Sequence, residues 1–162
     1  FLWIVHILSY FVNINNFGII PREVSGLPGI LFAPFLHRDF PHLAANSVSL
    51  FVLGMFLITL EHKRTYWIIA AVIILAGSGT WVFGKSGIHI GASGVVFGIF
   101  GYLITRGFFK RDFKSIVISL VVIFLYGGMI FGVLPGAESV SWEGHLCGLL
   151  AGIIVASSYG RK

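Results

Sequence analysis

Long runs of apolar residues, separated by short polar segments, dominate the chain. Six of these runs contain no Asp, Glu, Lys or Arg: Phe1 to Pro21, Leu43 to Leu60, Thr65 to Gly84, Ser86 to Thr105, Ser115 to Ala137 and Gly144 to Gly160. Each is close to the roughly 20 residues that a helix needs to cross about 30 Å of hydrocarbon. The runs are continuously apolar and do not alternate with polar residues, which favours helices over a membrane barrel.

This pattern predicts one all-α membrane domain over residues 1–162, built as a bundle of six transmembrane helices in a lipid bilayer. We expect the helices at about 1–20, 42–60, 65–83, 93–109, 115–133 and 144–159. The segment 21–41 mixes prolines and charges with large apolar residues. That mixture is typical of a loop lying in the membrane interface, on the outer side.

Composition and charge support a membrane protein. Hydrophobic residues make up 57% of the chain and charged residues only 10%, whereas about a quarter of the residues of a soluble domain are charged. The net charge of +5 does not indicate nucleic-acid binding, because the basic residues flank the apolar runs. If the chain enters from the cytoplasm, eight Lys and Arg residues lie inside and three outside: Lys63, Arg64, Arg106, Lys110, Arg111, Lys114, Arg161 and Lys162 against Arg22, Arg38 and Lys85. This bias predicts cytoplasmic termini, and it suits a bacterial plasma membrane.

The stretch GTWVFGKSGIHIGASGVVFG, residues 79–98, contains two candidate signatures. Gly79, Gly84, Lys85 and Ser86 fit the phosphate-loop pattern GxxxxGK[ST]. That pattern binds nucleotide only between a strand and a helix, with a second acidic motif to hold magnesium. Here the preceding residues continue an apolar helix, so we expect a glycine-rich turn and no nucleotide.

The second signature, GASG around Ser93, gains support from the predicted topology. The second, fourth and sixth helices all run from outside to inside, so their first residues share one depth. His42 and Asn46 begin the second helix, Ser93 the fourth and His145 the sixth. Polar side chains at this depth must face protein or a water-filled cavity.

Small residues indicate which helix faces meet. Gly94, Gly98 and Gly101 follow Ser93 along one stripe, and His145 continues into a stripe of Gly148, Gly152 and Ala156. Stripes of this kind let membrane helices approach closely. Packing the two stripes together would bring His145 within hydrogen-bond reach of Ser93.

A serine beside a histidine forms a nucleophile with its general base. The sequence offers no aspartate at this level, so we expect a Ser93–His145 dyad. His42 and Asn46 share a helix face, and with the backbone N–H of Ser93 they could stabilise the oxyanion of a tetrahedral intermediate. This chemistry needs no metal ion and no other cofactor.

These residues resemble the rhomboid family of intramembrane serine proteases. The stretches that carry the resemblance are FLHRDFPHLAANSVSLFVLG with His42 and Asn46, the end of the second helix from Gly54 through Glu61, GASGVVFGIFGY with Ser93, and GHLCGLLAG with His145. With the six spans, the resemblance covers essentially the whole chain.

The resemblance implies a six-helix rhomboid core with Ser93 as nucleophile, His145 as general base and acid, and His42, Asn46 and the Ser93 amide as oxyanion hole. Gly91 would shape the turn before the serine. The implied substrates are single-pass membrane proteins, cleaved near the outer end of their helix. The fifth helix and the loop from Leu134 to Glu143 would govern substrate access. The chain departs from the family at Phe97, where many members have Tyr, and it lacks a Trp-Arg pair in the first outer loop.

Two other functions remain open at this stage. A membrane metal hydrolase could use His37, His42, His89 and His145, since three histidines suffice for a catalytic zinc site, although no HExxH motif supports it. A non-proteolytic, rhomboid-like membrane scaffold would use the polar cluster only for structure.

Overall fold

The structure is a computed structural model that describes residues 1–136 and 140–159. The chain forms seven α-helices within these residues: α1 (Leu2–Ser9), α2 (Gly29–Phe32), α3 (Phe40–Glu61), α4 (Thr65–Phe83), α5 (Ser93–Lys110), α6 (Phe113–Tyr126) and α7 (Trp142–Tyr159). Four 3₁₀ helices accompany them: η1 (Ile14–Phe17), η2 (Val24–Gly26), η3 (Ala33–Phe35) and η4 (Gly127–Val133). The prediction of an all-helical chain is therefore confirmed for the described residues.

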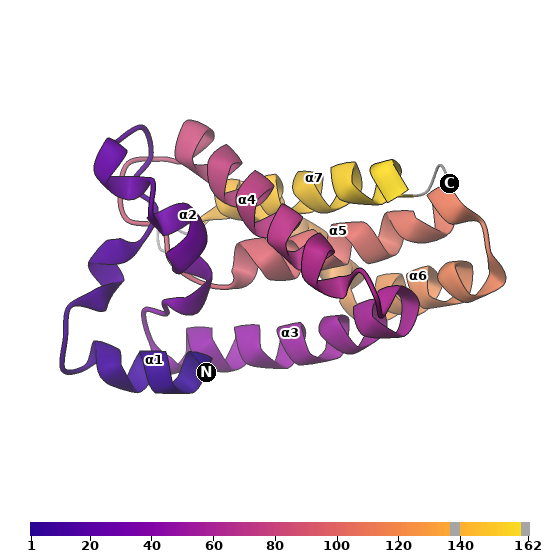
Figure 1. Cartoon of the computed structure of the whole chain (residues 1–162), viewed down its shortest axis with the longest axis horizontal. Coiled ribbons are helices and arrows are strands. Elements are labelled where there is room, and N and C mark those ends of the chain that lie inside the picture. Colours follow the sequence, from indigo (N-terminus) through magenta and orange to yellow (C-terminus); the bar gives the residue numbers. More distant parts are fainter. Residues whose placement is uncertain (137–139, 160–162) are drawn as a thin grey trace.

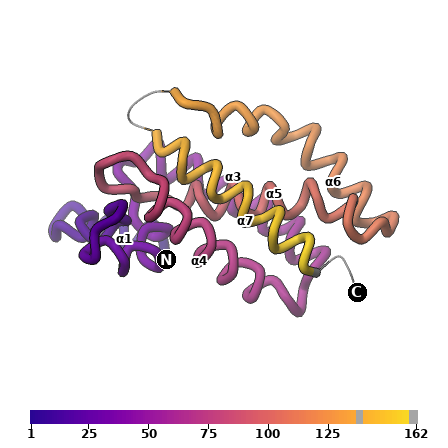
Figure 2. Tube along the Cα trace, turned by 90° about the horizontal axis from the view of Figure 1, so that it is seen from above, coloured from indigo at the N-terminus to yellow at the C-terminus, as the bar shows by residue number. Residues whose placement is uncertain are grey.

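Helix α5 is the centre of the bundle. It contacts α3, α4, α6 and α7, and Figure 2 shows α6 and α4 on opposite sides of the pair formed by α5 and α7. Its buried side chains, among them Ile99, Phe100 and Leu103, pack with Leu53 and Leu57 of α3 in the hydrophobic core. Because α5 is enclosed by other helices, the residue at its start is held from several directions.

The closest packing in the bundle is between α5 and α7, along the two predicted stripes of small residues. A side chain at Gly148 would overlap the Gly94 carbonyl, and one at Gly152 would overlap the Gly98 carbonyl. The predicted packing of the stripes is thus confirmed. This contact lets two polypeptide backbones touch and fixes how far α7 can slide along α5.

Helices α3, α5 and α7 all begin at one end of the bundle, which we call the site end. Figure 1 shows this end at the left, beside α2. Local capping explains where α3 starts: the Asp39 carboxylate accepts a hydrogen bond from the His42 backbone N–H at 2.9 Å, and Pro41 lies in the first turn. An aspartate cap followed by proline is a strong signal for a helix start.

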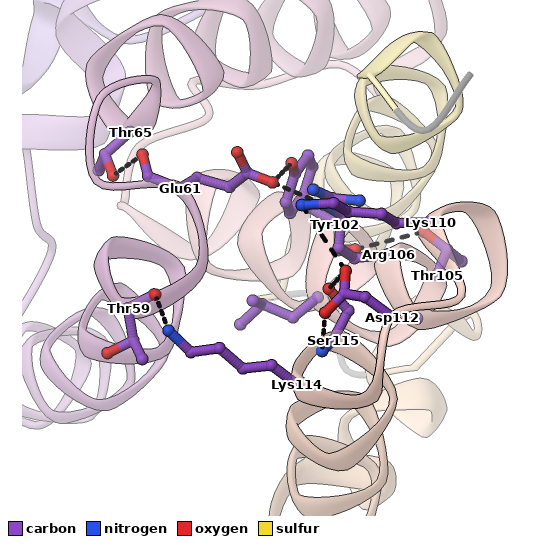
Figure 3. A network of polar contacts seen from close by, with 12 residues as sticks. Thr59, Glu61, Thr65, Tyr102, Thr105, Arg106, Lys110, Asp112, Lys114 and Ser115 are labelled. Carbon is purple, nitrogen blue, oxygen red and sulfur yellow. Dashed lines mark hydrogen bonds and ion pairs between the residues drawn. The ribbon is translucent and has the colours of Figure 1, made fainter. Parts of the chain in front are cut away.

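A buried polar network holds the opposite end of the bundle (Figure 3). The Glu61 carboxylate on α3 accepts hydrogen bonds from the Arg106 guanidinium at 2.6 Å and from the Tyr102 hydroxyl at 2.9 Å. The Thr65 hydroxyl donates to the Glu61 carbonyl, which adds the start of α4. The network joins three helices, and all of its members are almost fully buried.

The predicted helix over residues 1–20 is wrong in length. Helix α1 ends at Ser9, and after a turn the chain forms the short helix η1. The second half of the predicted helix holds Asn13, Asn15 and Asn16, and asparagine side chains compete with the backbone hydrogen bonds of a helix. Ile19 then pairs in an extended bridge with His89. The eight residues of α1 span about 12 Å, too little to cross the hydrocarbon.

The count of six spans is not confirmed either. In the described part of the chain, three helical segments are long and apolar enough to cross a membrane: Phe40–Glu61, Thr65–Phe83 and Phe113–Val133. The last of these joins α6 to η4. Helix α5 has a comparable length but carries the buried Arg106. A helix enclosed by other helices does not need an apolar surface for lipid.

The remaining predicted segments differ from the structure in detail. The predicted helix over 115–133 begins earlier and changes to a 3₁₀ helix at Gly127, where two adjacent glycines weaken the α-helix. The segment 21–41 contains η2, α2 and η3, and Gly77 of α4 lies against Ile30. The predicted access loop from Leu134 to Glu143 includes residues 137–139, which lie outside the described residues.

Candidate functional site

The turn that precedes Ser93 is held by three contacts. Gly91 has a backbone φ of +123°, and a Cβ there would lie 2.6 Å from two atoms of the His42 ring. Both facts require glycine at this position. The Gly91 N–H donates to the Ala33 carbonyl at 2.9 Å, and the Ala92 N–H points to His37 Nε2 at 3.5 Å. The segment before α3 therefore sets the position of Ser93, the first residue of α5.

Helix α3 supplies an imidazole and an amide on the same face. His42 lies in the first turn against Gly91, and Asn46 follows one turn later. Asn46 is 6% exposed, and its buried Nδ2 has no hydrogen-bond partner in the structure. Leaving a buried donor unpaired costs about 1–3 kcal/mol. Such a group is available to a ligand oxygen.

His145 lies in the first turns of α7 and is oriented by two contacts. Its ring stacks on Phe97 of α5 with a centroid separation of 4.2 Å and an interplanar angle of 8°. Its Nδ1 lies 2.9 Å from the Gly132 carbonyl. A carbonyl oxygen only accepts hydrogen bonds, so Nδ1 carries the proton and Nε2 of the neutral ring is left as a base.

The predicted site residues of the three helices meet at one cavity. Its volume is about 810 Å³, and His42, Asn46, Ser93, Phe97 and His145 all line it. Gly91, Gly94, Gly148 and Gly152 shape its surroundings through the turn and the α5–α7 contact described above. A nucleophile, a base and a free amide donor are thereby brought to one cavity.

The hydrogen bond expected between Ser93 and His145 is not among the hydrogen bonds of the described residues. His145 instead uses Nδ1 for the Gly132 carbonyl. Catalytic hydrogen bonds are often long without substrate and tighten when it binds. The Ser93–His145 dyad, and with it the roles of His42 and Asn46, therefore stays a prediction.

His37 is the buried histidine beside the Ser93 turn. It is 1% exposed, and its ring meets the His42 ring edge to face at 5.1 Å. Burial, with a smaller contribution from the neighbouring His42, lowers the pKa of His37 from 6.5 to about 4. Nearby, the His42 backbone N–H and then Arg38 lower the pKa of the partly exposed Asp39 carboxyl. The neutral His37 ring and the charged cap both support the first turn of α3.

We expect this low pKa of His37 to make folding stability depend on pH between about 6.5 and 4. In this range the unfolded chain binds a proton that the folded chain refuses, so stability is complete above pH 6.5 and falls as the pH drops towards 4. Thermal unfolding in detergent at a series of pH values measures this effect. A His37→Gln variant keeps a hydrogen-bond acceptor but does not titrate. Its stability should fall less steeply, and equal slopes would contradict the assignment.

The structure also places the phosphate-loop pattern and the histidines of the alternative metal site. Gly84, Lys85 and Ser86 follow the end of α4 and have no strand before them, so the correct reading of this pattern is a turn. His89 is engaged with Ser141 and Lys85. In the described part of the chain, no group of three or more His, Cys, Asp or Glu side chains gathers in a way that could hold a metal ion.

Two features of the site have no signal in sequence patterns: a backbone group, and the burial of His37, which the sequence suggested only as a possible metal ligand. The Gly132 carbonyl that orients His145 belongs to the backbone, so residue identity gives no signal for it. His37 differs from the other histidines only in burial and contacts, which depend on tertiary packing. Sequence patterns indicate which side chains could react, whereas the effect of these two groups depends on where the fold places them.

Comparison with known proteins gives a consistent result. The family model described as "Rhomboid domain" matches residues 25–162. An uncharacterized protein of Mycobacterium tuberculosis is 43% identical over 148 residues, which cover 86% of this chain and 62% of the relative. An uncharacterized protein of Mycobacterium leprae is 39% identical over 153 residues, 89% of this chain and 61% of that protein. "RHOMBOID-like protein 4" of Arabidopsis thaliana is 27% identical over 145 residues, 84% of this chain and 35% of that protein. The chain thus spans less than two thirds of the length of these relatives.

Proposed function

We propose that this chain, which belongs to the rhomboid family, is an intramembrane serine endopeptidase with a Ser93–His145 dyad. The observation that carries the proposal is that Ser93, His145, His42 and Asn46 all line one cavity. Three helices from distant parts of the sequence contribute these groups. A serine, an imidazole and an unpaired amide donor around one space are the components of acyl transfer.

In the proposed first step, Ser93 Oγ attacks the carbonyl carbon of the scissile peptide bond while His145 Nε2 accepts the hydroxyl proton. The Gly132 carbonyl holds the other ring proton on Nδ1, which is the orienting role that an aspartate has in a triad. His145 then gives its proton to the leaving amine as the C–N bond breaks. Water hydrolyses the resulting acyl-enzyme with the same base.

The oxyanion that forms in this step would accept three hydrogen bonds. The donors are the Asn46 amide, the His42 ring and the Ser93 backbone N–H. The amide of Asn46 is buried without a partner, and the first N–H groups of a helix such as α5 have no partner within the helix. Donors arranged before the charge develops stabilise the transition state at little reorganisation cost.

The proposed substrates are single-pass membrane proteins that are cut near the outer end of their transmembrane helix. The site end carries Ser93, and the basic residues at the opposite end favour a cytoplasmic position for that end, as in a bacterial plasma membrane. Small or helix-destabilising residues would let the substrate backbone unwind. Unwinding is needed because the hydrogen bonds of a helix shield its carbonyls.

The test is cleavage of a model single-pass substrate by the purified chain in proteoliposomes. Terminal mass spectrometry of the products identifies the cleaved bond, and a fluorophosphonate probe identifies the nucleophile. We expect one cut near the outer end of the substrate helix, probe labelling at Ser93, loss of cleavage after labelling and no effect of a chelator. Cleavage that persists after complete labelling, or that a chelator abolishes, would overturn the proposal.

A further inference from the structure

The histidine at position 89 links the two segments that carry the proposed dyad. It lies in the connection between α4 and α5, four residues before Ser93, and it is 7% exposed. Its Nδ1 lies 2.6 Å from the hydroxyl of Ser141, which directly precedes α7. Its Nε2 lies 2.8 Å from the Lys85 carbonyl. This ring has no part in the chemistry proposed above, yet both of its nitrogens are engaged.

The hydrogen-bonding partners fix which group donates and which accepts in the series of bonds from Lys85 through His89 and Ser141 to Gly144. The Lys85 carbonyl can only accept, so His89 Nε2 carries the proton and donates it. Nδ1 of the neutral ring then accepts from the Ser141 hydroxyl. The same hydroxyl oxygen accepts from the Gly144 N–H at 3.3 Å. Each polar atom in this series of hydrogen bonds is thus a donor or an acceptor as its chemistry allows.

The Ser141 hydroxyl therefore caps the start of α7 and is itself held by His89. A serine side chain that accepts from the backbone N–H three residues later is the usual cap of a helix N-terminus. The backbone of the turn continues this constraint, since the His145 N–H donates to the Ser141 carbonyl at 3.1 Å. The position of Ser141 thus determines where the first turn of α7 presents His145.

The other side of the link is equally fixed. His89 exchanges two backbone hydrogen bonds with Ile19, at 2.9 and 2.8 Å, which hold the segment in front of Gly91 and Ser93. A second contact joins the connection between α4 and α5 to the segment before α7, because the Lys85 ammonium donates to the Val140 carbonyl at 3.3 Å. His89 and Ser141 also line the cavity of about 50 Å³ that Ser93 borders.

We propose that His89 and Ser141 form a positioning pair that sets the separation and orientation of His145 relative to Ser93. The inference rests on the proposed function, because it concerns the geometry of that dyad. Neither residue is a catalytic residue: His89 acts through Ser141, and Ser141 acts through the first turn of α7. A displacement of about 1 Å between reacting groups can cost about 10²-fold in rate, so the pair affects turnover more than substrate binding.

The experiment is a double-mutant cycle on kcat and KM with the model substrate. His89→Phe keeps an aromatic ring but has neither nitrogen, and Ser141→Ala removes the hydroxyl. We expect each variant to lower kcat by about 10- to 100-fold with KM within about twofold of the parent. The double variant should be no worse than the more severe single variant, because both changes break one chain of hydrogen bonds. Ser141→Thr keeps the hydroxyl and should restore turnover.

The matched control is Ser115→Ala at the opposite end of the bundle. Ser115 is buried, and its hydroxyl donates to the capping carboxylate of Asp112 at the start of α6. This variant should lower the melting temperature as much as Ser141→Ala but leave kcat unchanged. An equal loss of kcat in Ser115→Ala, or additive effects in the cycle, would show a general structural role and overturn the positioning pair.

The design separates failure of this inference from failure of the proposed function. If the parent cleaves the substrate, Ser93→Ala does not, and His89→Phe and Ser141→Ala keep the parent kcat, only the positioning pair is wrong. If the parent does not cleave, or Ser93→Ala cleaves like the parent, the proposed function is wrong and the inference falls with it.

Discussion

Replacing Ser93 with alanine is expected to reduce cleavage of a single-pass substrate by about 10⁴-fold or more, to the detection limit. The alanine side chain has no oxygen to attack the peptide carbonyl, and the donors around the cavity cannot replace a missing nucleophile. His145→Ala should have an effect of similar size, because without a base the hydroxyl keeps its proton. The double variant should be no slower, since residues that act as one unit have non-additive effects.

The measurement is the initial rate of cleavage at saturating substrate, with folding checked by thermal unfolding. Ser49 provides a matched control, because it is a serine that lines the same cavity and has no proposed role. Ser49→Ala should remain within about twofold of the parent. A Ser93→Ala protein that cleaves at the parent rate would exclude Ser93 as the nucleophile.

The second large effect is on stability and comes from the end of the bundle that Figure 3 shows. Glu61→Gln is expected to lower the free energy of unfolding by about 3–5 kcal/mol, because the Arg106 charge stays buried without its counter-ion. One nitrogen of Arg106, Nη1, already lacks a hydrogen-bond partner, so the guanidinium depends on the Glu61 carboxylate. For a chain of this length the change corresponds to a melting temperature about 10 °C lower.

Thermal unfolding in detergent tests this expectation, with Glu23→Gln as the matched control. Glu23 is exposed, and its carboxylate accepts a hydrogen bond from the nearby Ser25 hydroxyl, so the same chemical change there should cost no more than about 1 kcal/mol. A double variant, Glu61→Leu with Arg106→Met, should be more stable than Glu61→Gln, because it buries no charge. Equal melting temperatures for Glu61→Gln and Glu23→Gln would contradict the proposed importance of the buried pair.

The two ends of the bundle have different physical roles. The end with Glu61 has its buried carboxylate paired and bonded to two donors, as a stable membrane helix bundle requires. Buried nitrogens without a hydrogen-bond partner occur at both ends: Arg106 Nη1 at this end, and Asn46 Nδ2 and His37 Nδ1 at the site end. Of these three groups, Asn46 lines the cavity of about 810 Å³, where a ligand oxygen would complete its hydrogen bonding.

Phe97 illustrates how a departure from the family pattern fits this structure. Its ring stacks on His145, and the contact needs no hydroxyl group. A Cβ at Gly132 would lie 2.8 Å from the Phe97 ring, so the absence of a side chain at Gly132 gives the stacked pair its space. The Gly132 carbonyl then reaches His145 Nδ1. Phe97, Gly132 and His145 form a mutually dependent group.

The sequence by itself determined the helical class, most helix positions and the family resemblance. These features follow from local or periodic patterns: long apolar runs, the Asp39 cap with Pro41 that starts α3, and the glycines that let α5 and α7 touch. The length of the first helix was predicted wrongly: α1 ends at Ser9, and apolar composition does not register the asparagines that follow it, which disfavour a continued helix.

Only the tertiary structure decided how the candidate site is held. The Gly132 carbonyl on His145, the burial of His37 and the bond between His89 and Ser141 each join residues from separate elements. The Gly132 carbonyl is a backbone group, and His89 and Ser141 belong to no sequence motif. No residue pattern therefore indicates these contacts. Chemistry follows from residue identity, but orientation follows from the packing of all neighbours at once, and that information is not local in the sequence.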